Sequence, residues 1–182
     1  MNLPPLRLPD LDELIQLFVS NPAELGVFTA VEPGDMPAGY RRLLAHQEHM
    51  TVTVEAHHGC PVDVIVLDRK ITPSHYARNS LLTRQSDGAV VQFGIMRMHM
   101  NVLDPAVRAK IESEQIPLGR ILIEHDVLRR IRLQCLWRIE PAGALAESLR
   151  LSAPRTTYGR TAMMDLNGEP AVELLEIVAP LE

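Results

Sequence analysis

The sequence predicts an α+β fold with an antiparallel sheet of about six strands. Extended runs follow one another through short turns, such as Gln85-Ser-Asp-Gly88, instead of alternating regularly with helices. Polar and apolar residues alternate from Leu128 to Ile139, which is typical of a half-buried strand. The last two runs, Tyr158 to Leu166 and Ala171 to Ala179, are separated by Asn167-Gly-Glu-Pro170, and this pattern predicts a β-hairpin.

The composition limits the class of protein. The chain has 182 residues, which suits one domain with a hydrophobic core, and 46% of them are hydrophobic. The net charge is −5 and no basic block occurs, so we expect no nucleic-acid partner. No apolar run could span a membrane and no signal-peptide pattern opens the chain, so we expect no membrane partner. Two cysteines, Cys60 and Cys135, favour a reduced cytoplasmic protein.

We expect a single domain over residues 1–182, with an N-terminal helix and loop over residues 1–40 and a core over residues 41–182. Asp10 and Glu13 form a capping-box pattern for a helix from Leu11 to about Val19. A loop rich in proline and glycine follows. Tyr40 to about His57 is then predicted to be one helix that ends at Gly59.

The middle of the chain predicts three strands, over Val62 to Leu67, His75 to Thr83 and Ala89 to Met100. Gly94 interrupts the third strand. A glycine in mid-strand marks either a harmless bulge or a place where a ligand approaches the backbone, and the pattern alone leaves both interpretations open.

Two short helices are expected next. Asp104 and Pro105 have the residue types of a helix N-cap and first residue, for a helix that runs to about Gln115. Pro117 opens a further helix to about Glu124, which leaves the amide of Leu118 free for a carboxylate or for water. After the strand that ends at Ile139, residues 141–154 are predicted to be a loop with one helical turn at most.

The last strand carries the clearest candidate for a functional group. Side chains alternate between the two faces of a strand, so Glu176 shares its face with Val172, Leu174 and Val178. Burying a carboxylate in an apolar row is costly, so Glu176 has either a partner or a function. The alternative is an edge strand on which Glu176 lies in water.

Histidines and a cysteine gather within fifteen residues: His46, His49, His57, His58 and Cys60. The i, i+3 spacing of His46 and His49 could place two metal ligands on one helix face. No zinc motif is complete around them, so solvated histidines on a helix are the favoured interpretation. Phosphate-binding and dinucleotide-binding glycine motifs are also missing from the sequence. We therefore expect neither a metal nor another cofactor.

From Met50 onward the sequence resembles the chorismate pyruvate-lyase (4-hydroxybenzoate synthase) family. The matching pieces occur in family order and are Met50-Thr51 with Glu55, Arg78, Gly94, Pro117-Leu-Gly-Arg120, Tyr158-Gly-Arg160, Gly168-x-Pro170 and Glu176. The resemblance implies the chorismate lyase-like fold, in which helices pack on a twisted antiparallel sheet and helical flaps cover an internal site.

The resemblance also implies an activity, the cofactor-free elimination of pyruvate from chorismate to give 4-hydroxybenzoate. Arg78 would bind a substrate carboxylate, the Leu118 amide would make a second carboxylate contact, and Glu176 would accept a proton or orient the ring. The other implied contacts are Met50, Gly94 and Arg160.

Two other functions stay open. The same scaffold could be a non-catalytic binding domain for small aromatic carboxylates, in the manner of ligand-sensing domains on transcription factors. It could also be an interaction protein with a vestigial cavity. The presence of both Arg78 and Glu176 favours the enzyme. A small aromatic carboxylate is the expected partner of either the enzyme or the binding domain, and the oligomeric state stays open.

Overall fold

The computed structural model describes residues 9–181, and its centre is one antiparallel sheet. The seven strands are β1 (Gly26–Val31), β2 (Val62–Ile71), β3 (His75–Arg84), β4 (Val90–His99), β5 (Arg129–Pro141), β6 (Thr157–Leu166) and β7 (Glu169–Val178). Their order in the sheet is β1-β5-β6-β7-β4-β3-β2. The predicted α+β class, antiparallel sheet and closing hairpin are confirmed, with one strand more than the six that the sequence indicated.

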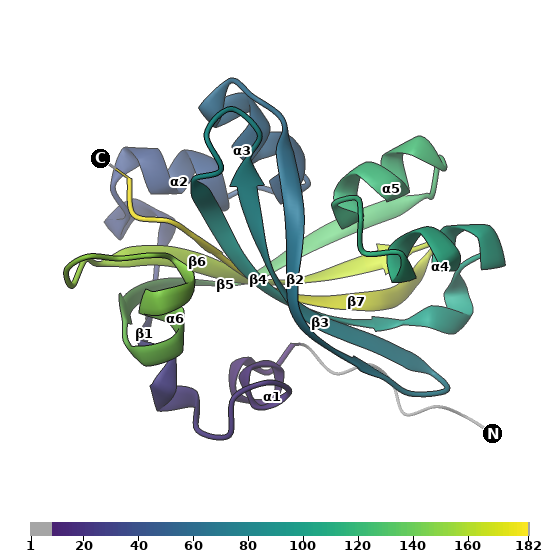
Figure 1. The fold of residues 1–182 in the computed structure, drawn as a ribbon, viewed down its shortest axis with the longest axis horizontal. Coiled ribbons are helices and arrows are strands. Elements are labelled where there is room, and N and C mark those ends of the chain that lie inside the picture. Colours follow the sequence, from purple (N-terminus) through teal and green to yellow (C-terminus); the bar gives the residue numbers. More distant parts are fainter. Residues whose placement is uncertain (1–8, 182) are drawn as a thin grey trace.

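The helices lie on both faces of the sheet. They are α1 (Leu11–Gln16), α2 (Ala38–Leu44), α3 (Met50–His58), α4 (Pro105–Glu112), α5 (Leu118–Glu124) and α6 (Gly143–Ser148), with 3-10 turns at Pro22–Glu24, Pro33–Asp35 and Met100–Val102. In Figure 1, α2 to α5 lie above the sheet, whereas α1 and α6 lie below it. Within residues 9–181, no helix has the length and the apolar character needed to cross a membrane.

Alternation along the strands separates the two layers of the core. On β4, Met96 and Met98 belong to the apolar cluster that contains Ile111 of α4 and Ile121 of α5. Phe93 and Ile95 point the other way, into the cluster that contains Leu14 and Ile15 of α1. A third cluster joins Leu44 of α2 and Val54 of α3 to the sheet. The sheet therefore has a hydrophobic layer on each face.

The extra strand is β1, which lies where the sequence predicted a loop. Its residues are only partly buried, so the periodic burial that marks a strand in the sequence is weak here. β1 exists because its backbone pairs with β5, from Gly26 opposite Pro141 to Val31 opposite Leu136. This long-range pairing has no local sequence signal.

The single helix predicted from Tyr40 to His57 is wrong, because the chain forms two helices with a loop between them. We call residues 45–49 the 45–49 loop. The His46 ring interrupts the helix: its Nε2 bonds to the Leu43 carbonyl oxygen at 2.6 Å, and its Nδ1 accepts from the Glu48 amide at 3.0 Å. These side-chain bonds replace the backbone bonds that a continuous helix would make.

One edge of the sheet is exposed. β2 is the last strand in the order, and Ile65, Leu67 and Ile71 present their side chains to solvent. The pairing of β2 with β3 shifts register between Val66 and Asp68, which marks a bulge in this edge strand.

Candidate ligand-binding site

A cavity lies between the sheet and the N-terminal ends of α3 and α5. Its volume is about 70 Å³, enough for several waters or a small ligand. The cavity brings together five of the six residues that the sequence singled out for the site, namely Met50, Arg78, Gly94, Leu118 and Glu176. The sixth, Arg160, does not line it.

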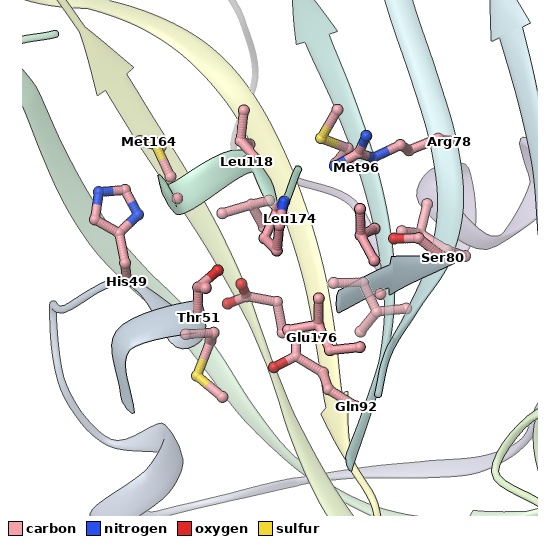
Figure 2. A pocket seen from close by; sticks show the side chains of 18 residues that line it. His49, Thr51, Arg78, Ser80, Gln92, Met96, Leu118, Met164, Leu174 and Glu176 are labelled. Atoms are coloured by element: carbon pink, nitrogen blue, oxygen red, sulfur yellow. The ribbon is translucent and has the colours of Figure 1, made fainter. Parts of the chain in front are cut away.

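Strand register explains why residues from distant parts of the sequence meet here. One row across the sheet contains Arg78, Met96 and Leu174. The next row contains Ser80, Gly94 and Glu176. All six side-chain positions face the same layer, and the two rows lie about 7 Å apart. In Figure 2, Arg78 and His49 lie toward opposite ends of the cavity, with Leu118 and Leu174 between them.

Arg78 is a buried cation that faces this cavity. Only 3% of its surface is exposed, and its Nε and Nη1 atoms have no hydrogen-bond partner among the described residues. Leaving two buried donors of a charged group without acceptors costs folding free energy. A carboxylate or phosphate group can accept two parallel hydrogen bonds from a guanidinium, so either kind of anion would satisfy Arg78.

Other unpartnered polar atoms also gather at the cavity. Seven buried side-chain N or O atoms in the described part of the chain lack a partner, and four of them belong to residues that line this cavity. They are Arg78 Nε and Nη1, Gln92 Oε1 and His49 Nε2. Buried polar groups are normally hydrogen-bonded, so this concentration indicates a site for a polar ligand or for water.

Glu176 has a partner that the sequence did not identify. β7 lies between β6 and β4, so the alternative of an edge strand with Glu176 in water is wrong. Glu176 as a residue is 9% exposed, and its Oε2 accepts a hydrogen bond of 2.7 Å from Arg160 Nε. Arg160 is fully buried and lies opposite Glu176 in the β6–β7 register. The two residues form a buried ion pair at the cavity wall.

The helices that cover the cavity are joined to one another. Arg120 of α5 forms an ion pair with Glu55 of α3, and Glu55 Oε1 also accepts from the amide of Val62 at 2.9 Å. A Cβ added at Gly119 would lie 3.0 Å from Thr51 Oγ1, so the two helix starts pack closely. The Glu55–Arg120 ion pair therefore holds α3 and α5 together over the cavity.

Gly94 and Gly159, the two glycines near the site, differ in whether a larger residue would fit. Gly94 pairs regularly with its neighbours, and a Cβ there would meet Leu175 O at an ordinary 3.5 Å. The irregularity in β4 lies elsewhere, near Val90. At Gly159 a Cβ would lie only 2.7 Å from Glu176 O, so this glycine permits β6 to approach β7 beside the ion pair. Sequence reasoning singled out Gly94 as a site residue and included Gly159 only as part of the Tyr158-Gly-Arg160 motif.

The histidines are placed differently from the sequence-based interpretation. His46 lies in the 45–49 loop and His49 is the N-cap of α3, so the two do not share a helix face. Among residues 9–181, no group of three or more His, Cys, Asp or Glu side chains is arranged to hold a metal ion. Burial, with help from the positive charges of Arg129 and Arg160, lowers the pKa of His49 to about 4.

The pKa of His49 predicts an acid-sensitive contribution to stability. As the pH falls from 6.5 toward 4, the unfolded chain protonates His49 while the native protein does not, so the free energy of unfolding decreases. Replacing His49 with Gln should remove about 1–3 kcal/mol of this loss. Urea unfolding at pH 7, 5.5 and 4 would measure it. The variant His57→Gln, at an exposed position, is the control. The prediction would be contradicted if the free energy of unfolding fell with pH by the same amount in His49→Gln and in the wild type.

Comparison with known proteins gives matches of fold and none of sequence. No protein-family description matches the chain, and no curated protein matches it. The crystal structure of PhnF from Mycobacterium smegmatis is similar with a TM-score of 0.57 and 12% identity, over 74% of this chain and 64% of that one. This chain therefore spans less than two thirds of the length of that PhnF chain.

Two further solved structures also match the chain. The effector domain of PhnF from Mycobacterium smegmatis has a TM-score of 0.54 and 12% identity, over 72% of this chain and 88% of that one. A GntR-family transcriptional regulator from Bacillus cereus has a TM-score of 0.45 and 14% identity, over 65% of this chain and 92% of that one. At such identities the similarity shows the fold.

These comparisons confirm the chorismate lyase-like fold and correct the function that the sequence suggested. The two structures that match with a TM-score above 0.5 are those of PhnF and of its effector domain, and neither is described as a lyase. The identification as a chorismate pyruvate-lyase is therefore wrong, and so is the expected elimination of pyruvate from chorismate. The exclusion of nucleic acid is corrected as well, because the net charge and the lack of a basic block describe only this chain, which spans 64% of the PhnF chain that it matches.

Proposed function

We propose that residues 1–182 form one effector-binding domain, which binds a small anionic molecule and regulates transcription without catalysing a reaction. The observation that carries this proposal is the guanidinium of Arg78, buried beside a cavity with two unpartnered nitrogen atoms. The likeness in fold to the PhnF effector domain supports it.

The proposed ligand has an anionic group and an apolar body. Arg78 binds the anion through two charge-assisted hydrogen bonds. The body packs against the apolar lining of the cavity, made by Met50, Met96, Leu118, Met164 and Leu174. Methionine side chains are unbranched and adaptable, which suits a site that selects a ligand by its charge and approximate size. The backbone at Gly94 and the carboxylate of Glu176 complete the wall.

Regulation of transcription implies action on DNA, and we propose the cytoplasm as the location. The two cysteines, Cys60 and Cys135, form no disulfide, which agrees with a reducing compartment.

A matched set of probes tests the proposal. Benzoate and phenyl phosphate carry an anion on an aromatic ring, whereas benzamide has nearly the shape of benzoate and no charge. A ligand that binds only the native state at 100 times its Kd raises the free energy of unfolding by about 2.7 kcal/mol. We expect at least one of the two anions to raise Tm, and benzamide to leave it unchanged. If neither anion stabilises the protein, the anion site does not exist.

Incubation with chorismate separates the regulator from the enzyme. We expect no release of pyruvate and no aromatic product by ultraviolet absorbance. A purely regulatory function would be contradicted if the wild-type protein turned over chorismate and a variant of the cavity residues did not.

A further inference from the structure

One buried side chain connects the cavity wall to a loop at the surface. Besides its bond to Glu176, Arg160 donates from Nη1 to the carbonyl oxygens of His46 at 2.9 Å and Leu44 at 3.5 Å. Its Nη2 donates to the carbonyl oxygen of Glu48 at 3.0 Å. A single guanidinium therefore binds one cavity residue and three backbone carbonyls at or next to the 45–49 loop.

The His46 ring fixes the conformation of the same loop. A carbonyl oxygen can only accept a hydrogen bond, so the Nε2 that contacts the Leu43 carbonyl carries the ring proton. Nδ1 is then free to accept from the Glu48 amide. Burial and the nearby charge of Arg160 lower the pKa of His46 and favour this neutral form. Two side chains consequently hold the loop: His46, which belongs to it, and Arg160 of β6.

The outer side of the loop faces an open groove of about 650 Å³. The groove is lined by Gln47, Glu48 and His49 and by residues 126–131, which include the first residues of β5. His49 lines both this groove and the cavity. The 45–49 loop thus lies between the proposed ligand and the molecular surface.

We propose that Arg160 is a positioning residue that transmits occupancy of the cavity to the 45–49 loop. This inference rests on the proposed function, because it requires a ligand in the cavity. A ligand in contact with Glu176 changes the position of the carboxylate that holds Arg160 Nε. The guanidinium is planar and rigid, so a shift at Nε moves Nη1 and Nη2 with it and alters the bonds to His46 and Glu48. The shape of the groove then depends on the ligand.

Hydrogen exchange of the amides of residues 46–50, with and without saturating benzoate or phenyl phosphate, measures this coupling. In the wild type we expect a bound anion to change the exchange rates of these amides by about fivefold or more. In Arg160→Lys the response should disappear. An ammonium group is a point charge and cannot bind Glu176 and all three carbonyls in a fixed geometry. Exchange is compared at saturation, so a weaker Kd in the variant does not affect the comparison.

Two further variants make the result specific. Glu176→Gln retains the shape of the side chain and removes the charge that orients Arg160, so the loop response should shrink in a folded protein. Arg130→Lys changes an exposed groove residue and should leave the response intact.

The outcomes separate this inference from the proposed function. If neither anion binds in calorimetry, the proposed function fails and the coupling fails with it. If an anion binds but the loop amides of the wild type do not respond, or if Arg160→Lys responds like the wild type, only the coupling is wrong.

Discussion

Replacing Arg160 with methionine should lower the free energy of unfolding by about 3–5 kcal/mol, the scale for removing one partner of a buried ion pair. Methionine fills part of the space but cannot donate a hydrogen bond. Glu176 would then be a buried carboxylate without its partner, and the carbonyls of His46 and Glu48 would lose their donors. Urea unfolding at pH 7 measures the loss.

The double variant Arg160→Met/Glu176→Leu is the matched control. Because it removes both charges, it should recover part of the stability that the single variant loses. The carbonyls of the 45–49 loop stay without donors in both variants, so recovery should be incomplete. A loss below about 1 kcal/mol in the single variant would show that water or a local shift compensates for the missing guanidinium.

Arg78→Met should have the opposite effect on stability and a large effect on binding. Arg78 is buried without partners for two of its nitrogen atoms, so an apolar side chain of similar length should raise the free energy of unfolding by about 1–2 kcal/mol. The same change removes a charged hydrogen-bond donor, worth about 2–3 kcal/mol, and should weaken anion binding at least about thirtyfold.

The measurement is calorimetry with whichever of benzoate and phenyl phosphate binds the wild type, together with urea unfolding of both proteins. Arg69→Met is the control, because Arg69 lies beside Arg78 in the β2–β3 register but is half exposed, pairs with Glu114 and does not line the cavity. It should bind the anion like the wild type. Unchanged affinity in Arg78→Met would remove Arg78 from the site.

The partner of Glu176 shows where sequence reasoning stops. The hairpin turn was predictable, and Leu166 does pair with Glu169. If this register continued without a shift, Arg160 would lie opposite Leu175. Arg160 and Glu176 would then point to opposite faces of the sheet. A register shift between Met164 and Asp165 adds one residue to β7 and brings Arg160 opposite Glu176. The need for a partner follows from the sequence, but its identity depends on a bulge that leaves no local signal.

The two errors in the element assignments have the same cause. β1 is stabilised by β5, which lies about a hundred residues further along the chain. Besides the local bonds of the His46 ring, the loop that divides α2 from α3 is held by Arg160, also more than a hundred residues away. Local propensity could indicate neither contact, because both exist only in the folded chain.

The wrong enzyme assignment has a different cause. Several residues that carried the resemblance hold the fold and the cavity together. Arg120 and Glu55 join the two flaps, and Gly159 allows β6 and β7 to approach. A scaffold of this kind accommodates a binding domain as readily as an enzyme, so these residues indicate architecture and not chemistry.

The exposed edge strand affects how the protein behaves at high concentration. β2 presents three large aliphatic side chains beside backbone groups that no further strand within residues 9–181 covers, which is the usual starting point for aggregation by strand addition. The bulge next to Asp68 and the charges of Arg69 and Lys70 interrupt this surface. The bulge and these charges hinder the pairing of β2 with a strand of another molecule. Removing them would make the strand more regular and the protein less soluble.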